Sequence, residues 1–153
     1  MKTTKISLPK ITVVGKCGSA ADGKDFVTDL WTDLNKNFSE IAYLAKWNDS
    51  GSLKGLWGAM SDENLSFEKW DDIKKGLYLA GVEAVDDAVP PEGWTKWVIP
   101  SFEYIKAEVE SAQTFKDVVG YLIANKISLV GAVQNFTDPE TNVNYMMFPV
   151  KRN

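Results

Sequence analysis

Hydrophobic and polar positions in the first half of the chain follow two different periods. Residues 11–17 alternate between β-branched and smaller or polar side chains, which is typical of a strand. From Asp25 to about Lys46, apolar residues recur every three or four positions, as in an amphipathic helix: Phe26, Leu30, Leu34, Phe38, Ile41 and Ala45. Two more strands are predicted at 53–60 and 75–85, joined by an acidic hairpin loop at 61–73.

The pair Pro90-Pro91, near the midpoint, is the clearest interruption of this pattern, since adjacent prolines can neither continue a helix nor donate to a central ladder. After it the same kinds of element return in the same order: a strand at 94–110 with a kink at Pro100, a helix at 114–126, and strands at 130–137 and 143–151. This order predicts one α+β domain over residues 1–153. Two helices would cover one face of its sheet and leave the other face open.

Composition limits the chemistry that the chain can perform. Among 153 residues there is no histidine and a single cysteine, Cys17, which excludes histidine-dependent nucleophiles, histidine or four-cysteine zinc sites, and internal disulfides. Residues 14–19 lack the spacing of a phosphate-binding loop. The acidic cluster of Asp62, Glu63, Asp71 and Asp72 lacks the twelve-residue pattern of a calcium loop. No cofactor or metal is therefore expected, and any catalysis would depend on Glu, Asp, Tyr or Lys.

The net charge is −4, from 17 Lys and Arg against 21 Asp and Glu, and the longest basic runs are the pairs Lys74-Lys75 and Lys151-Arg152. Binding to a phosphate backbone needs clustered positive charge, so nucleic acid is not expected as a direct partner. No 18 apolar residues run together, and the first residues lack the apolar stretch of a signal peptide. We therefore expect no membrane association and a cytoplasmic location.

Several short motifs stand in a recognisable order along the chain: Gly81-Val82-Glu83, Val89-Pro90-Pro91-Glu92-Gly93-Trp94, Ile99-Pro100-Ser101-Phe102-Glu103-Tyr104, Asp138-Pro139, and Tyr145-Met146-Met147-Phe148-Pro149-Val150. In the first half, Val13-Val14-Gly15-Lys16, Leu30-Trp31 and the run 56–62 are consistent with them. Together these segments resemble the bacterial gyrase-inhibitor-like small-molecule-binding domain, also known as the AraC-type effector-binding domain, over nearly the whole chain.

The resemblance implies two pseudo-symmetric strand-helix-strand-strand modules, at about 8–86 and 93–152, in one antiparallel-type sheet. Both helices would lie on one face, and a ligand groove would lie between the halves on the other. In transcription regulators of the family this domain is fused to a DNA-binding domain and senses lipophilic, often cationic, compounds. No such fusion is expected here, so a stand-alone binder similar to the integron-cassette drug-binding relatives is the nearer analogy.

The chain carries six Trp, seven Phe and five Tyr, more than the core of one domain needs. An aromatic groove binds flat apolar compounds by burial and cations through the ring quadrupole. For any single tryptophan, ordinary core packing is the simpler explanation. With the family scheme, the nominated ligand-binding residues are Trp31, Trp57, Tyr78, Glu83, Trp97, Tyr104, Gln134, Phe136, Tyr145 and Met147.

Many relatives carry a Glu at the base of the groove, two residues before an aromatic, and the resemblance places Gln134 at that position. A neutral residue there weakens the expectation of cation preference, and also of an enzyme that needs this Glu as general acid or base. Glu83 and Glu103 are the nearest substitutes on predicted strands. A solvated carboxylate at a strand edge is the simpler explanation for each.

Three functions remain open from the sequence. The first is a non-enzymatic binder of lipophilic, aromatic or cationic small molecules, linked to transcription regulation or drug sensing. The second is a hydrolase of electrophilic toxins that uses a carboxylate and a tyrosine, with Glu83 and Tyr145 as the candidates. The third is a protein-interaction module whose partner is gyrase or a DNA-binding regulator. The absence of histidine favours binding over chemistry.

Overall fold

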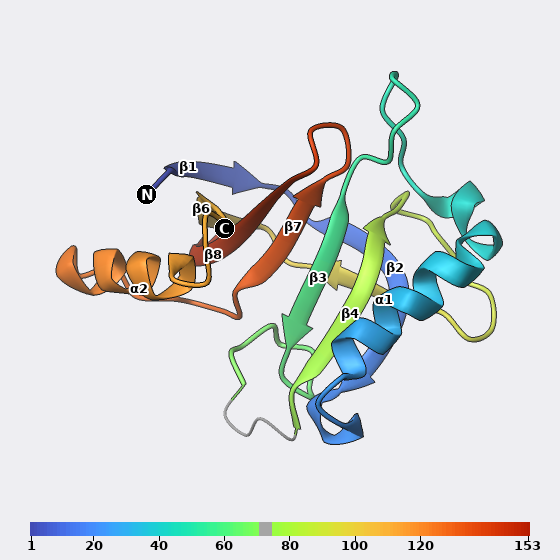
Figure 1. Cartoon of the computed structure of the whole chain (residues 1–153), viewed down its shortest axis with the longest axis horizontal. Helices are drawn as coiled ribbons and strands as arrows, with labels where there is room; N and C mark the ends of the chain where they lie inside the picture. The colour runs from blue at the N-terminus through green and yellow to red at the C-terminus, as the bar shows by residue number, and fades with distance from the viewer. Residues whose placement is uncertain (71–74) are drawn as a thin grey trace.

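The computed structural model describes residues 1–70 and 75–153, which form one curled sheet and two helices (Figure 1). The eight strands are β1 (Thr3–Leu8), β2 (Ile11–Ser19), β3 (Leu56–Ser61), β4 (Leu77–Glu83), β5 (Thr95–Ile99), β6 (Phe102–Glu108), β7 (Gln134–Asp138) and β8 (Val143–Arg152). The helices are α1 (Phe26–Asn37) and α2 (Thr114–Ala124). The strand order is β1-β6-β8-β7-β3-β4-β2-β5, and every neighbouring pair is antiparallel. The predicted α+β class is confirmed.

Each half of the chain contains one strand more than its pattern predicts. The halves run β1-β2-α1-β3-β4 and β5-β6-α2-β7-β8, and the first strand of each pairs with the other half: β1 with β6, and β5 with β2. A proline stands at both crossings, Pro9 and Pro100, where a residue without an N–H ends the ladder. The Ser101 hydroxyl ties the crossings together by donating to Leu8 O at 2.7 Å. The predicted single strand at 94–110 is therefore two strands with different partners.

The two halves meet in the middle of the sheet, where β3 pairs with β7 over three residue positions. Trp57 of β3 lies opposite Phe136 of β7 in this register, and Phe136 lies opposite Tyr145 of β8. Facing residues on neighbouring strands of a sheet point to the same side. The junction therefore places three aromatic side chains in a row across the two halves.

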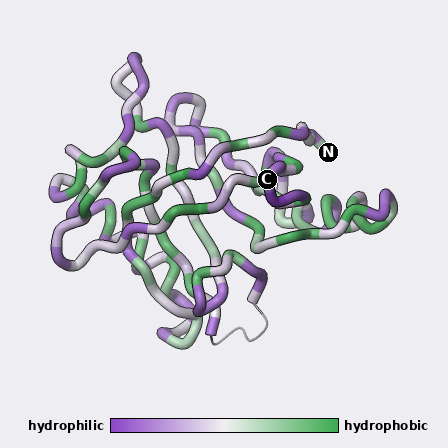
Figure 2. Tube along the Cα trace, turned by 180° about the vertical axis from the view of Figure 1, so that it is seen from behind, coloured by the Kyte–Doolittle hydropathy of each residue, from purple (hydrophilic) through white to green (hydrophobic). Residues whose placement is uncertain are grey.

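Both helices lie on one face of the sheet. The helix α1 crosses in front of β2 and β4 in Figure 1 and buries Leu34 beside Val14 and Val82. In the second half, Val118 and Leu122 of α2 pack on residues of β6 and β8. Seen from behind, both hydrophobic and hydrophilic residues occur along the sheet (Figure 2). The central strands β3 and β4 are buried over most of their length, as expected where both faces of a sheet are covered.

The first helix is shorter than the apolar spacing predicts. It ends at Asn37, and the chain continues through two 3₁₀ turns at Phe38–Glu40 and Ala42–Leu44. Ile41 and Leu44 are still buried against the sheet, so they keep a helix-like spacing of apolar residues in a segment that has left the α-helix. The apolar spacing therefore predicted a helix up to about residue 46, although only the part up to Asn37 is α-helical.

The face of the sheet away from the helices carries a second core. Trp57, Leu79, Trp97, Phe102 and Tyr104 are buried there, together with Phe67 from the loop after β3. The described part of the predicted hairpin loop is confirmed as a loop, and its Phe67 ring meets Trp97 edge-on at 5.7 Å between centroids. Phe67 closes part of this face, so only the remainder is available to a ligand.

Candidate functional site

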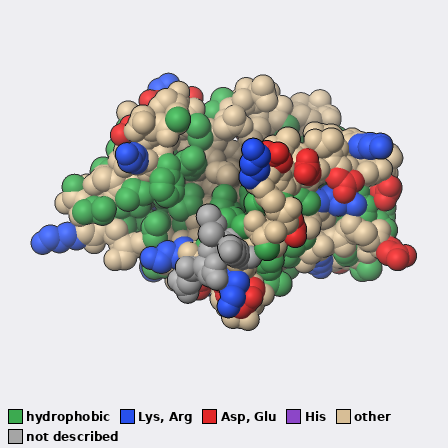
Figure 3. Space-filling view, turned by 60° about the horizontal axis from the view of Figure 1, so that its bottom comes forward, with side chains coloured by type: hydrophobic (Ala, Val, Ile, Leu, Met, Phe, Trp, Pro, Cys, Tyr) green, Lys and Arg blue, Asp and Glu red, His purple; other side chains and the backbone are tan. Residues whose placement is uncertain are grey.

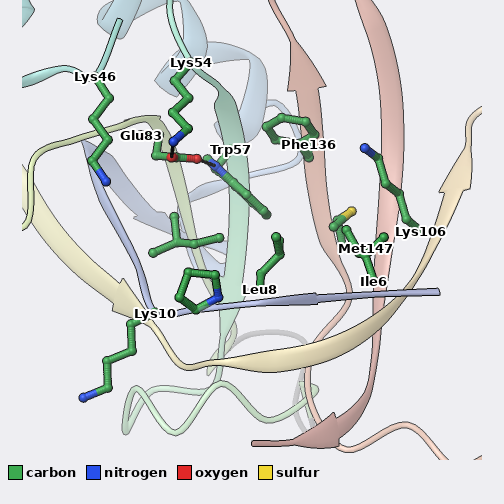
Figure 4. Close-up of a pocket in the computed structure, with 12 residues that line it drawn as sticks. Ile6, Leu8, Lys10, Lys46, Lys54, Trp57, Glu83, Lys106, Phe136 and Met147 are labelled. Carbon is green, nitrogen blue, oxygen red and sulfur yellow. Dashed lines mark hydrogen bonds and ion pairs between the residues drawn. The ribbon is translucent and has the colours of Figure 1, made fainter. Parts of the chain in front are cut away.

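A groove opens on the sheet face away from the helices, at the junction of the two halves (Figure 4). Its volume is about 260 Å³. Both halves contribute to its lining, which consists of Ile6, Leu8, Pro9, Lys10, Ile11, Lys46, Lys54, Trp57, Glu83, Lys106, Phe136 and Met147. Apolar side chains make up most of the lining, and the charged ones are four lysines and one glutamate.

Two aromatic rings form one wall of the groove. The centroids of Trp57 and Phe136 lie 4.8 Å apart, and Tyr145 stacks on the other side of Phe136 at 6.2 Å with an interplanar angle of 26°. Gly55 is needed for this arrangement, because a Cβ there would lie 2.5 Å from Phe136 Cε2. The row of rings is therefore positioned by cross-strand register and by one glycine.

Among the residues that the structure describes, the single carboxylate in the lining belongs to Glu83, at the end of β4. Its Oε1 accepts a hydrogen bond from Trp57 Nε1 at 3.1 Å, and its Oε2 lies 3.9 Å from Lys54 Nζ. The Glu83 side chain is only 12% exposed. Glu83 thus fixes the orientation of the Trp57 indole, and Lys54 balances its charge.

Lysines surround the apolar part of the groove, and the sequence reasoning nominated none of them. Figure 4 shows Lys46 and Lys54 on the side of Glu83 and Lys106 across the groove. Lys106 Nζ lies 4.1 Å from the centre of the Tyr145 ring and 5.6 Å from that of Phe136. One signal was available, because the alternation along 102–109 puts Lys106 on the same face as Tyr104.

Gln134 lies outside the groove lining and is completely buried at the start of β7. Its Oε1 accepts from the Met60 N–H at 2.6 Å, and its Nε2 donates to Met60 O at 2.9 Å and to Ala132 O at 3.2 Å. The side-chain amide thus satisfies the backbone N–H and C=O of Met60, as the backbone of a neighbouring strand would. Met60 lies just beyond Gly58, where the pairing of β3 with β7 ends. This task needs a donor and an acceptor together, which an amide has and a carboxylate lacks.

The structure brings four of the ten nominated residues together in the groove: Trp57, Glu83, Phe136 and Met147. Tyr145 is adjacent through its stacking on Phe136. Trp97 and Tyr104 are on the same sheet face but are buried in its core. Trp31 and Tyr78 lie on the helix side, where Trp31 Nε1 donates to the Tyr78 hydroxyl at 2.9 Å. Glu103, the other carboxylate considered, pairs with Lys5 at 3.2 Å.

The two buried tyrosines differ in what their hydroxyls meet. Burial raises the pKa of both, and for Tyr78 the hydrogen bond from Trp31 opposes part of that rise. Within residues 1–70 and 75–153, the Tyr104 hydroxyl has no hydrogen-bond partner. A buried hydroxyl without a partner costs free energy, whereas a bonded one contributes about 1 kcal/mol.

Tyr104→Phe is accordingly expected to raise the free energy of unfolding by about 1 kcal/mol, because it removes an unsatisfied polar atom and keeps the ring. Tyr78→Phe should lower it by about 1 kcal/mol, since Trp31 then loses its acceptor. Urea unfolding of the two variants beside the parent chain measures both changes. Destabilisation by Tyr104→Phe equal to that of Tyr78→Phe would contradict this assignment.

Other features considered from the sequence are accounted for in the described residues. Residues 14–19 lie in β2 and form no loop. No group of three or more metal-ligating side chains occurs within residues 1–70 and 75–153, and Asp71 and Asp72 of the acidic cluster lie outside them. Across those same ranges, no helix has the length and apolar character needed to cross a membrane.

A second hollow, of about 340 Å³, lies between α2, β3 and the segment before β7. Phe115, Leu129, Val133 and Met146 line it, as does Trp70, the last described residue before the gap. Figure 3 shows hydrophobic side chains gathered on the bottom face of the molecule, beside the residues drawn in grey. None of the ten nominated residues lines this hollow.

Several solved structures share this fold. SAV2435 bound to tetraphenylphosphonium matches over 99% of this chain and 94% of its own, with a TM-score of 0.65 and 17% identity. The C-terminal domain of EcmrR matches over 99% and 98%, with a TM-score of 0.65 and 9% identity. An integron cassette protein from Vibrio cholerae matches over 98% and 95%, with a TM-score of 0.53 and 14% identity.

Comparisons of the sequence itself with protein-family models and with curated proteins find no match. At identities of 9% to 17%, the likeness to the solved structures concerns the fold. At that level, these neighbours confirm the resemblance to the gyrase-inhibitor-like effector-binding domain that the motifs indicate.

Proposed function

We propose that the protein binds small molecules with a flat apolar body in the groove beside Trp57. The observation that carries this proposal is the row of rings at the β3–β7 junction, where Trp57 and Phe136 face a lining of aliphatic side chains from both halves. At about 260 Å³, the groove is slightly smaller than the usual range for small-molecule sites, roughly 300 to 1,000 Å³. A bicyclic aromatic compound is of suitable size.

The arrangement of the polar groups supports binding without turnover. Glu83 already accepts from Trp57 and pairs with Lys54, so it is held as a structural anion of the groove wall. Tyr145, the other residue of the hydrolase hypothesis, lies behind Phe136 and outside the lining. A carboxylate and a hydroxyl that act on one substrate must both reach it. These positions favour the binding hypothesis.

The structural neighbours support the same proposal. SAV2435 holds tetraphenylphosphonium, a cation with four aromatic rings, which supports an aromatic ligand here but does not fix the charge of that ligand. EcmrR has been solved in a complex with DNA, and the match covers 58% of that EcmrR chain. We infer that ligand binding in this protein serves sensing, linked to drug response or transcription regulation. A protein partner such as gyrase or a DNA-binding regulator remains a prediction from the family resemblance.

The wall of rings is tested by Phe136→Ala, with the neutral compound 2-naphthalenemethanol as the probe in isothermal titration calorimetry. An aromatic contact is worth about 0.5 to 1.5 kcal/mol, so the variant should bind about 2- to 12-fold more weakly. Phe115→Ala is the matched control, since Phe115 is 46% exposed on α2 and does not line the groove. Equal affinity of the Phe136→Ala variant and the parent chain would contradict the proposed site.

A further inference from the structure

The groove and the whole chain carry charges of opposite sign. The chain has a net charge of −4, but the lining contains Lys10, Lys46, Lys54 and Lys106 against Glu83 alone. One further carboxylate, Asp86, lies 3.7 Å from Lys46 and is 85% exposed. Even with Asp86 included, the groove has an excess of positive charge. Charge of one sign gathered in a cleft attracts ligands of the other sign.

Glu83 offers little to a cationic ligand. Its two oxygens already face Trp57 Nε1 and Lys54 Nζ, and its side chain is nearly buried. A ligand cation would have to displace Lys54 from this carboxylate, and would then meet the remaining lysines. Like charges at close range oppose binding. The carboxylate therefore serves the groove wall and is not a free counter-charge.

Lys106 is placed differently from the other lysines. It is half-buried on β6, opposite Met147 of β8, and its ammonium lies over the Tyr145 ring. In the described ranges, 1–70 and 75–153, no carboxylate lies within 4 Å of its Nζ, so its contacts there are with ring faces. Figure 4 shows this ammonium across the groove from Lys54 and Glu83. A partly desolvated ammonium without an ion pair gains from a nearby anion.

We propose that the groove selects organic anions: compounds with a flat apolar body and a carboxylate or similar acidic group. The body lies against Trp57 and Phe136, and the acidic group accepts a charge-assisted hydrogen bond from Lys106. Lys46 and Lys54 add to the positive potential from the opposite side. This inference rests on the proposed function of the groove and names the charge of its ligand.

Three naphthalene probes of matched shape separate charge from shape: 2-naphthoate, 2-naphthalenemethanol and 2-naphthylmethylammonium. In calorimetric titrations of the full chain at pH 7, the anion should bind about 10-fold more tightly than the neutral probe, and the cation more weakly than either. Added salt should weaken the binding of the anion and leave that of the neutral probe nearly unchanged.

Lys106→Met keeps most of the side-chain length and removes the charge. It should lower the preference for 2-naphthoate over 2-naphthalenemethanol about 10-fold, because both probes lose the same contacts with the lysine side chain and only the anion also loses the ammonium. Lys24→Met is the control, because Lys24 is exposed in the segment before α1, outside the lining. Neutral or cationic probes that bind as tightly as the anion would overturn the inference and leave the proposed function standing. If none of the three probes binds, the proposed function fails and the inference fails with it.

Discussion

Replacing Gln134 by Glu is expected to lower the free energy of unfolding by about 3 to 5 kcal/mol at pH 7, the range for an uncompensated buried charge. Gln134 is completely buried, and its amide both donates to and accepts from the backbone of Met60. A carboxylate could still accept from the Met60 N–H, but it would face the Met60 and Ala132 carbonyl oxygens without a donor.

The pH dependence distinguishes a buried charge from a simple loss of packing. Burial would raise the folded-state pKa of the new carboxyl above its unfolded value of about 4.3, so the folded variant binds a proton more readily than the unfolded one. Its stability relative to the parent chain is therefore greatest below about pH 4 and falls as the pH rises toward the folded pKa. Urea unfolding at pH 4 and pH 7 measures this difference.

Gln134→Met is the control for that experiment, since it removes the amide without adding a charge. It should destabilise the protein by a similar amount at both pH values, because the Met60 backbone groups lose their partner in each case. A Gln134→Glu variant as stable as the parent chain at pH 7 would show that this site is wetter or less constrained than the hydrogen bonds indicate.

Leu8→Trp is expected to weaken binding of apolar ligands about 100-fold while the fold persists. Leu8 is half-exposed on β1 and lines the groove, so a larger side chain there can occupy the groove without overpacking the core. A ligand that loses about 120 Å² of buried apolar surface loses about 3 kcal/mol, which is about 100-fold in affinity. Calorimetry with 2-naphthalenemethanol measures this loss, and circular dichroism checks the fold.

Ile123→Trp controls for the added tryptophan. Ile123 is 72% exposed on α2, away from the groove, and its replacement should leave the affinity unchanged. If Leu8→Trp and the parent chain bind the probe equally well, the ligand lies elsewhere, and the second hollow beside Phe115 becomes the next place to test.

Local patterning predicts much of this fold, and its failures have identifiable physical causes. The alternation at 102–109 and the helix predicted at 114–126 correspond to β6 and α2, although Phe115 and Ile123, which the apolar spacing of that helix would bury, are exposed. The strand β1 was missed because Thr3, Thr4 and Lys5 are exposed at a sheet edge, where no apolar face is required. Its partner β6 lies about a hundred residues away, and no local pattern contains that pairing.

The candidate site shows the same division between local and long-range information. Trp57, Phe136 and Met147 could be nominated from predicted strands and the family scheme, but alternation along 145–150 did not decide which face of that strand lines the groove. Lys106 could not be distinguished from a solvated lysine, because its position depends on the pairing of β6 with β8 and on the rings beyond it. Gln134 matched a family position but faces the backbone of β3, which only the register of β3 and β7 determines.

The most direct test uses the tryptophans as reporters of position, in a ¹⁵N-labelled sample titrated with 2-naphthalenemethanol. The indole N–H groups of Trp57, Trp31 and Trp94 have separate partners, Glu83, Tyr78 and Glu40, and only Trp57 lines the groove. A Trp57→Phe variant assigns its signal. We predict that the Trp57 indole signal shifts and saturates with the probe, while those of Trp31 and Trp94 stay in place. An unmoved Trp57 signal, with or without movement of the others, would contradict a ligand site in this groove.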